Sequence, residues 1–147
     1  MPDRDIMISK VSSVQRCLKR IKDVTSLNPT SLENQDKQDI FVLNLQRGIQ
    51  ACIDLAAHIV ASEALGIPQT VRENFSLLQN KGIISRDMTV KMQKMTGFRN
   101  IAVHDYQTMD PKILKSVLTK DLKDLEDFYV AVLEFYGFGN EKQVQHN

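Results

Sequence analysis

Glycine and proline, which most often interrupt regular secondary structure, are scarce in this sequence: six glycines and four prolines occur in 147 residues. No linker rich in proline, glycine or serine is present, and neither is an internal repeat or a low-complexity tract. A chain of this length can bury one hydrophobic core but not two independent ones. We therefore expect a single domain over residues 1–147, with 138–147 as a flexible tail.

Long hydrophobic runs are also missing. The longest unbroken apolar run extends from Phe128 to Leu133, far short of the roughly 20 residues that span a bilayer. The polar and acidic opening from Met1 to Asp5 is followed by no hydrophobic stretch, so no secretory signal peptide is predicted. We expect a cytoplasmic protein without membrane contact.

The sequence also has few cysteines and little net charge. Cys17 and Cys52 each fall on or beside the apolar stripe of a predicted helix, where a free cysteine behaves as a small hydrophobic residue. No disulfide, metal site or cofactor is expected. The formal net charge of +1 lacks the strongly basic balance of proteins with a general affinity for nucleic acid. Any contact with RNA must therefore be local.

Hydrophobic residues recur at three- and four-residue spacing through most of the chain, which indicates helices. The expected helices cover 5–24, 35–65, 71–80 with Thr70 as its cap, a segment capped by Ser85, and a last segment that begins at Asp110-Pro111 and is kinked near Asp121. The longest helix has a broad apolar face formed by Phe41, Val42, Leu45, Ile49, Cys52, Ile53, Ala56, Ile59 and Val60. No stretch alternates with a period of two. The fold class is therefore all-α, an antiparallel bundle of about five helices.

One arginine breaks the apolar pattern of the fourth helix. In a continuous helix Arg99 lies within about 20° of Met88 and Met95, so its guanidinium points along the hydrophobic stripe. One interpretation is structural, with the side chain reaching solvent or pairing with an acid on a neighbouring helix. The other is that the charge is held there for chemistry.

His104 follows Arg99 on the same predicted helix. In an unbroken helix their spacing turns the two side chains about 140° apart. They can face one site only if the helix breaks between Gly97 and Asp105, or if a second copy of the chain supplies the partner. A single histidine is more often a surface or packed residue than a catalyst, so spacing alone leaves its role open.

A second polar group lies opposite the apolar face of the longest helix. Arg47, Asp54 and His58 fall within about 40° of one another there. They form either a solvated outer face with an Asp–His pair, or the lining of a dimer cleft in which Arg47 holds phosphate and Asp54 orients an active-site group. A metal site is not favoured, because two candidate ligands without others do not complete one.

The segment Gly97-Phe98-Arg99-Asn100-Ile101-Ala102-Val103-His104-Asp105-Tyr106 resembles the motif of HEPN domains, in which a polar residue follows an arginine and a histidine comes a few residues later. The four residues between arginine and histidine, and the tyrosine two positions on, are similar to the HepT branch of bacterial toxins. Leu45 to Val60 is similar to the long helix of that branch, and Leu65-Gly66-Ile67-Pro68 to the turn after it.

The resemblance implies a metal-independent endoribonuclease toxin that acts as a symmetric homodimer, with a ribose 2′-OH attacking the adjacent phosphorus. His104 would be the general acid or base, Arg99 would clamp the phosphoryl oxygens, and Asn100 would orient His104 or the phosphate. The resemblance also implies that a nucleotidyltransferase antitoxin transfers AMP to Tyr106, blocking the site by charge and bulk. The alternative for Tyr106 is a ring that only packs and a hydroxyl that only hydrogen-bonds.

Two other functions stay open at this point. The near-neutral charge also fits a non-catalytic helical subunit that presents a nucleotide or substrate to a separate nucleotidyltransferase. The amphipathic stripes alone fit a plain helical scaffold. If the chain is a ribonuclease toxin, its expected partners are RNA, the antitoxin and a second copy of the chain.

Overall fold

The computed structural model describes residues 1–138, and every regular element in that range is helical. In chain order the elements are α1 (Arg4–Thr25), the 3₁₀ turn η1 (Pro29–Glu33), α2 (Gln35–Ser62), α3 (Glu73–Asn80), α4 (Arg86–Asp105), the 3₁₀ turn η2 (Tyr106–Thr108), α5 (Pro111–Ser116), the π-helical segment η3 (Val117–Asp121) and α6 (Lys123–Phe135). Because α5, η3 and α6 form one rod, the expected set of five helices is confirmed. Beyond residue 138, the predicted tail lies outside the described residues.

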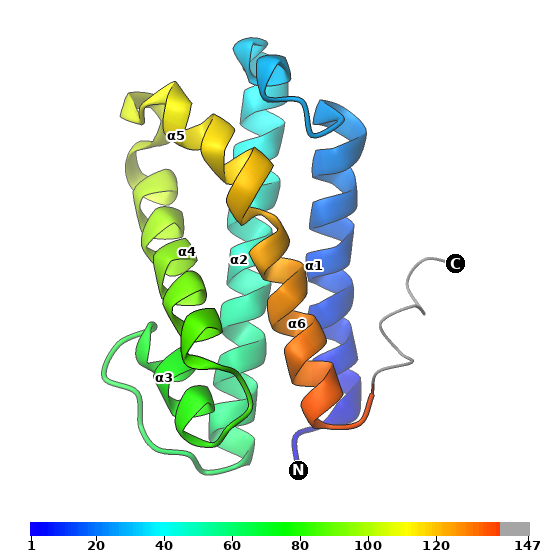
Figure 1. Cartoon of the computed structure of the whole chain (residues 1–147), viewed down its shortest axis with the longest axis vertical. Helices are drawn as coiled ribbons and strands as arrows, with labels where there is room; N and C mark the ends of the chain where they lie inside the picture. Colours follow the sequence, from blue (N-terminus) through cyan, green and yellow to red (C-terminus); the bar gives the residue numbers. More distant parts are fainter. Residues whose placement is uncertain (139–147) are drawn as a thin grey trace.

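The long helices run alternately in opposite directions around a central α2. Figure 1 shows α1 and α4 running one way, and α2 and the rod of α5 and α6 running the other. α2 contacts α1, α3, α4 and α6, while the short α3 also packs against α4. This is the antiparallel bundle that the sequence predicts. Within the described range, no helix is both long and apolar enough to cross a membrane.

Side-chain caps begin two helices where the sequence predicts them. Ser85 Oγ accepts a hydrogen bond from the Met88 N–H at 3.0 Å, before α4. Asp110 Oδ1 accepts one from the Lys112 N–H at 2.9 Å, before α5. Each cap satisfies a backbone donor that has no partner within its own helix.

Two helix ends differ from the sequence-based expectation. α3 begins at Glu73 rather than at 71, although Thr70 Oγ1 does accept a hydrogen bond from the Glu73 N–H at 3.3 Å. α2 ends at Ser62 rather than at 65. Its early end follows from Ala64, which adopts a left-handed backbone with φ of 51° and so turns the chain off the helix axis.

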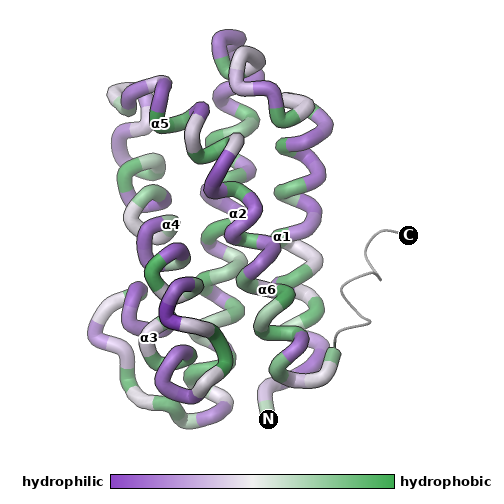
Figure 2. Tube along the Cα trace, in the orientation of Figure 1, coloured by the Kyte–Doolittle hydropathy of each residue, from purple (hydrophilic) through white to green (hydrophobic). Residues whose placement is uncertain are grey.

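The apolar face predicted for α2 forms the centre of the hydrophobic core. All the residues named for that face are buried. Phe128 of α6 meets Phe75 of α3 edge to face, with ring centres 5.4 Å apart. Cys17 and Cys52 are free and buried, as predicted. In Figure 2 hydrophobic and hydrophilic residues alternate in bands along the long helices. This pattern places the hydrophobic residues of each helix on the side that faces the core.

The rod of α5 and α6 bends at η3 (Figure 1). The Leu122 N–H donates to the Val117 carbonyl oxygen at 2.9 Å, a five-residue step that inserts one extra residue into the helix. The kink predicted near Asp121 is therefore confirmed, and a π-bulge is its cause. Beyond the bend, α6 lies against α1, α2 and α4.

Candidate active site

Arg99 is held half-buried on α4, close to the centre of α2. Its Nη1 donates to the side-chain oxygen of Gln50, and its Nη2 donates to Asn100 Oδ1 at 2.6 Å. Its Nε is buried and has no hydrogen-bond partner among the described residues. The guanidinium therefore hydrogen-bonds two neutral amides, and it forms no ion pair with an acid within residues 1–138.

A line of polar contacts continues from Gln50 across α2 to α1. Gln50 Nε2 donates to Asp54 Oδ1 at 2.9 Å, and Asp54 Oδ2 lies 3.5 Å from Lys10 Nζ. Asp54 thus reaches Arg99 only through the Gln50 amide. Sequence reasoning missed Gln50, because its contact with Arg99 joins residues 49 positions apart.

Arg47 lies beside this line of contacts. Its side chain is exposed and lines a hollow of about 440 Å³ between α1 and α2, together with Lys10, Arg16 and Asp54. Gln50, the hydrogen-bond partner of Arg99, also lines this hollow, whereas Arg99 itself is not among the lining residues.

His58 has a structural partner at the start of α1. Its Nε2 accepts a hydrogen bond from the backbone N–H of Asp3 at 3.0 Å, and Ser62 Oγ lies 3.5 Å from the same atom. The contacts of Asp54 are with Gln50 and Lys10, so the Asp–His pair considered from the sequence is not formed. Across residues 1–138, no three His, Cys, Asp or Glu side chains form a group that could hold a metal ion.

His104 lies in the last turn of α4 and is exposed. It lines a shallow pocket of about 230 Å³ with Ala102, Asp105, Tyr106 and their neighbours. α4 continues without a break to Asp105. Two arrangements could bring Arg99 and His104 together, and the prediction of a helix break is therefore wrong. A second copy of the chain stays a prediction.

Tyr106 follows α4 directly and reaches across to the beginning of α2. Its hydroxyl donates a hydrogen bond to Asp39 Oδ1, and Gln35 Nε2 donates to the same oxygen at 2.8 Å. The hydrogen bond to Asp39, partial burial and the nearby carboxylate charge raise the pKa of Tyr106 above its usual value. Asp39 was missed from the sequence because it lies 67 residues from Tyr106.

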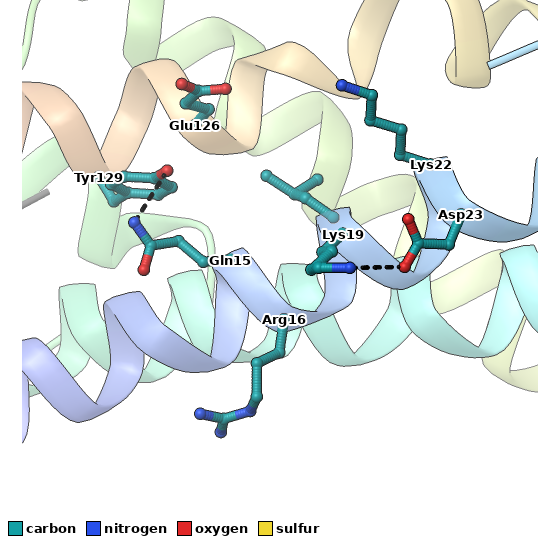
Figure 3. Close-up of a pocket in the computed structure, with 8 residues that line it drawn as sticks. Gln15, Arg16, Lys19, Lys22, Asp23, Glu126 and Tyr129 are labelled. Carbon is teal, nitrogen blue, oxygen red and sulfur yellow. Dashed lines mark hydrogen bonds and ion pairs between the residues drawn. The ribbon is translucent and has the colours of Figure 1, made fainter. Parts of the chain in front are cut away.

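A further hollow of about 410 Å³ lies on another side of the bundle, between α1 and α6 (Figure 3). Gln15 Nε2 donates to the hydroxyl of Tyr129 at 3.4 Å within it, and Lys19 pairs with Asp23 at 2.8 Å. None of its lining residues belongs to the segment 97–106. This hollow is therefore separate from the segment that contains Arg99, His104 and Tyr106.

The sequence and fold match one family of known proteins. A family model described as ribonuclease HepT-like matches residues 14–132. The chain is 42% identical over 124 residues to the mRNA nuclease HepT of Shewanella oneidensis, a match that covers 84% of this chain and 93% of that protein.

Two solved structures agree with that match. The tri-AMPylated HEPN toxin of Shewanella oneidensis, solved in complex with its MNT antitoxin, is similar with a TM-score of 0.82 and 40% identity, over 88% of this chain and 98% of that one. A toxin–antitoxin complex with AMP-PNP gives a TM-score of 0.81 at 40% identity, over 88% of this chain and 98% of that one. Sequence and three-dimensional structure thus lead to the same conclusion: this chain belongs to the family of HepT-like ribonucleases.

Proposed function

We propose that this chain is the toxin of a toxin–antitoxin system, a metal-independent endoribonuclease that cuts mRNA in the cytoplasm. The observation that carries the proposal is the environment of Arg99 on α4, where its half-buried guanidinium donates hydrogen bonds to the neutral amides of Gln50 and Asn100. A guanidinium has five N–H donors, of which Gln50 and Asn100 use two. Because Nε is buried, the second N–H of Nη1 and that of Nη2 are the donors left to bind the oxygens of a phosphate.

The proposed reaction uses only groups of the protein, from one or two copies of the chain, and of the RNA. A ribose 2′-oxygen bonds to the adjacent phosphorus, the bond from phosphorus to the 5′-oxygen breaks, and a 2′,3′-cyclic phosphate and a 5′-hydroxyl result. His104 moves a proton, either from the attacking hydroxyl or to the leaving oxygen. Arg99 stabilises the negative charge that develops on the phosphoryl oxygens. Asn100, bonded to Arg99, keeps the guanidinium in position.

A symmetric homodimer completes the proposed site. Because α4 is continuous, Arg99 and His104 of one chain point in different directions. A twofold partner that places its own α4 alongside would bring Arg99 of each chain near His104 of the other. The exposed Arg47 and the half-buried Asp54 would then lie along the same cleft, where Arg47 holds RNA phosphate.

Neutralisation is proposed to occur by AMP transfer to Tyr106. The support is twofold: a relative with 40% identity is described as tri-AMPylated and in complex with an antitoxin, and Tyr106 lines the same small pocket as His104. AMP at this position would add a negative phosphate and a nucleoside beside the proposed site. Both the charge and the bulk would keep RNA away from His104 and Arg99.

The proposal is tested with purified protein that mass spectrometry shows to be unmodified. It should cleave single-stranded RNA in the presence of EDTA, and His104→Ala and Arg99→Ala should each reduce the rate by about 100-fold or more. Arg86→Ala, an exposed arginine in the first turn of the same helix, is the matched control and should cleave like the wild type. Unchanged cleavage in both site variants overturns the nuclease site.

A different outcome would support the alternative role. Unmodified protein that binds nucleotide tightly and cuts no RNA would identify a non-catalytic subunit that works with a nucleotidyltransferase. The near-neutral charge of the chain is the feature that fits such a subunit.

A further inference from the structure

The hydroxyl of Tyr106 is already engaged with a carboxylate before any modification. Tyr106 lies in η2, and its hydroxyl donates to Asp39 Oδ1, near the start of α2. Gln35, one turn earlier on α2, donates to the same oxygen at 2.8 Å and so fixes the direction of the carboxylate. The acceptor, its orienting amide and the phenol therefore form one preorganised group.

We propose that Asp39 is the proton acceptor for AMP transfer to Tyr106, so that this chain supplies a catalytic group for its own modification. This inference rests on the proposed function, which makes Tyr106 the target of an antitoxin that uses ATP. Asp39 qualifies as catalytic because it touches the atom that reacts.

The step balances with ATP as the co-reactant. Tyr106 Oη bonds to the α-phosphorus of ATP, the bond from that phosphorus to the bridging oxygen breaks, and pyrophosphate leaves with the electron pair. The phenolic proton passes to Asp39 Oδ1 and from there to water. As the new bond forms, the phenolic oxygen becomes strongly acidic, and transfer to a carboxylate becomes favourable.

The same contact keeps the unmodified hydroxyl protonated. The hydrogen bond to Asp39 raises the pKa of Tyr106, so the phenolate is not formed in the resting protein. The other ionisable neighbours in its pocket, His104 and Asp105, make no hydrogen bond to the Tyr106 hydroxyl within the described residues. Asp39 is therefore the group placed to take the proton when phosphorus approaches.

Modification also ends the contact that assisted it. The esterified oxygen of Tyr106 has no proton to donate, and the new phosphodiester is negatively charged. Once Asp39 has passed its proton to water, two like charges face each other, so the modified side chain is expected to leave the start of α2. Release of η2 from α2 would then accompany silencing of the site.

The decisive experiment measures the rate of the first AMP addition to the full-length chain by intact mass spectrometry. The reaction contains ATP and the nucleotidyltransferase antitoxin. Asp39→Asn keeps a side-chain oxygen that can accept the Tyr106 hydrogen bond but removes the basic carboxylate. It should lower kcat by about 100-fold or more, with an unchanged KM for the toxin. Asp39→Glu, which keeps a carboxylate, should recover part of the rate.

Asp36→Asn is the matched control, since Asp36 is an exposed acid in the first turn of the same helix that makes no hydrogen bond to Tyr106 in the described structure. It should be modified at the wild-type rate. A second measurement, the ultraviolet titration of the tyrosines, should show a lower pKa for Tyr106 in Asp39→Asn. A wild-type rate for Asp39→Asn, or an unaltered Tyr106 pKa, overturns the inference.

Failure of the proposed function gives a separate result. If wild-type protein takes up no AMP, or if Tyr106→Phe takes it up as fast as wild type, then Tyr106 is not the target. In that case the proposal that Tyr106 receives AMP is wrong. If Tyr106 is modified but Asp39→Asn leaves the rate unchanged, only the inference about Asp39 is wrong.

Discussion

Arg99 and His104 lie on one continuous helix, yet they are presented to different surroundings: Arg99 is half-buried against α2, and His104 is exposed in the last turn of α4. The helical repeat places the two side chains about 140° apart, and no break relieves this. A site that needs both groups must therefore take one of them from another molecule.

Mixing two inactive variants should restore cleavage if the site is shared between copies. In a dimer of Arg99→Ala with His104→Ala, one of the two composite sites keeps both intact groups, and the other loses both. Random exchange makes half of the dimers mixed, so about a quarter of wild-type activity is expected. The measurement is RNA cleavage after the two proteins are co-refolded or incubated until their subunits exchange.

The control for this mixture is the double variant, Arg99→Ala with His104→Ala in the same chain, mixed with either single variant. No dimer in that mixture has a complete site, so it should stay inactive. If the first mixture also stays inactive while light scattering shows that mixed dimers form, the shared site is wrong.

Gln50 should act on catalysis through Arg99. Gln50→Ala removes the acceptor of Arg99 Nη1 and also the donor to Asp54, which frees a half-buried guanidinium to move. We expect kcat for RNA cleavage to fall by about tenfold to 100-fold, with KM little changed, because misplacement of a clamp weakens the transition state most. Gln46→Ala, one turn earlier on α2, serves as control and should keep kcat. Equal rates for the two variants would show that Gln50 does not position Arg99.

Asp124 should make stability depend on pH. Burial in α6 raises the pKa of this carboxyl, and the nearby Lys91 offsets only part of that effect. A raised pKa means that the folded state binds the proton more tightly than the unfolded chain. The contribution of protonated Asp124 to the free energy of unfolding is therefore fully present below the ordinary aspartate pKa of about 3.9. It is lost as pH rises through the raised pKa of the folded state.

Asp124→Asn removes this titration, so the variant should have a higher Tm than wild type at neutral pH and the same Tm in acid. Thermal unfolding followed by circular dichroism across this pH range is the measurement. Glu126→Gln, an exposed acid on the same helix whose charge does not contribute to the raised Asp124 pKa, should leave the difference in Tm between neutral and acid pH unchanged. A variant that is less stable than wild type at neutral pH would mean that the Asp124 carboxylate makes a favourable contact.

Much of the fold follows from local pattern. The buried face of α2, the caps at Ser85 and Asp110 and the bend near Asp121 were all predicted, because periodic burial and helix capping depend on residues within one or two turns. The predicted ends of α2 and α3 were wrong by two or three residues. There, a left-handed residue at Ala64 and a late start at Glu73 depend on how the connecting chain packs.

The sequence by itself determined the all-helical class, the chemically suggestive segment from Arg99 to Tyr106 and the position of Arg99 along an apolar stripe. The tertiary structure decided what those residues touch: Gln50 for Arg99, Asp39 for Tyr106 and the backbone of Asp3 for His58. It also decided that α4 stays continuous, which removes any single-chain meeting of Arg99 and His104. The physical reason is that helix periodicity fixes the direction of a side chain. The residue that this side chain contacts lies on another helix, far away in the sequence, and only the packing of the bundle brings the two together.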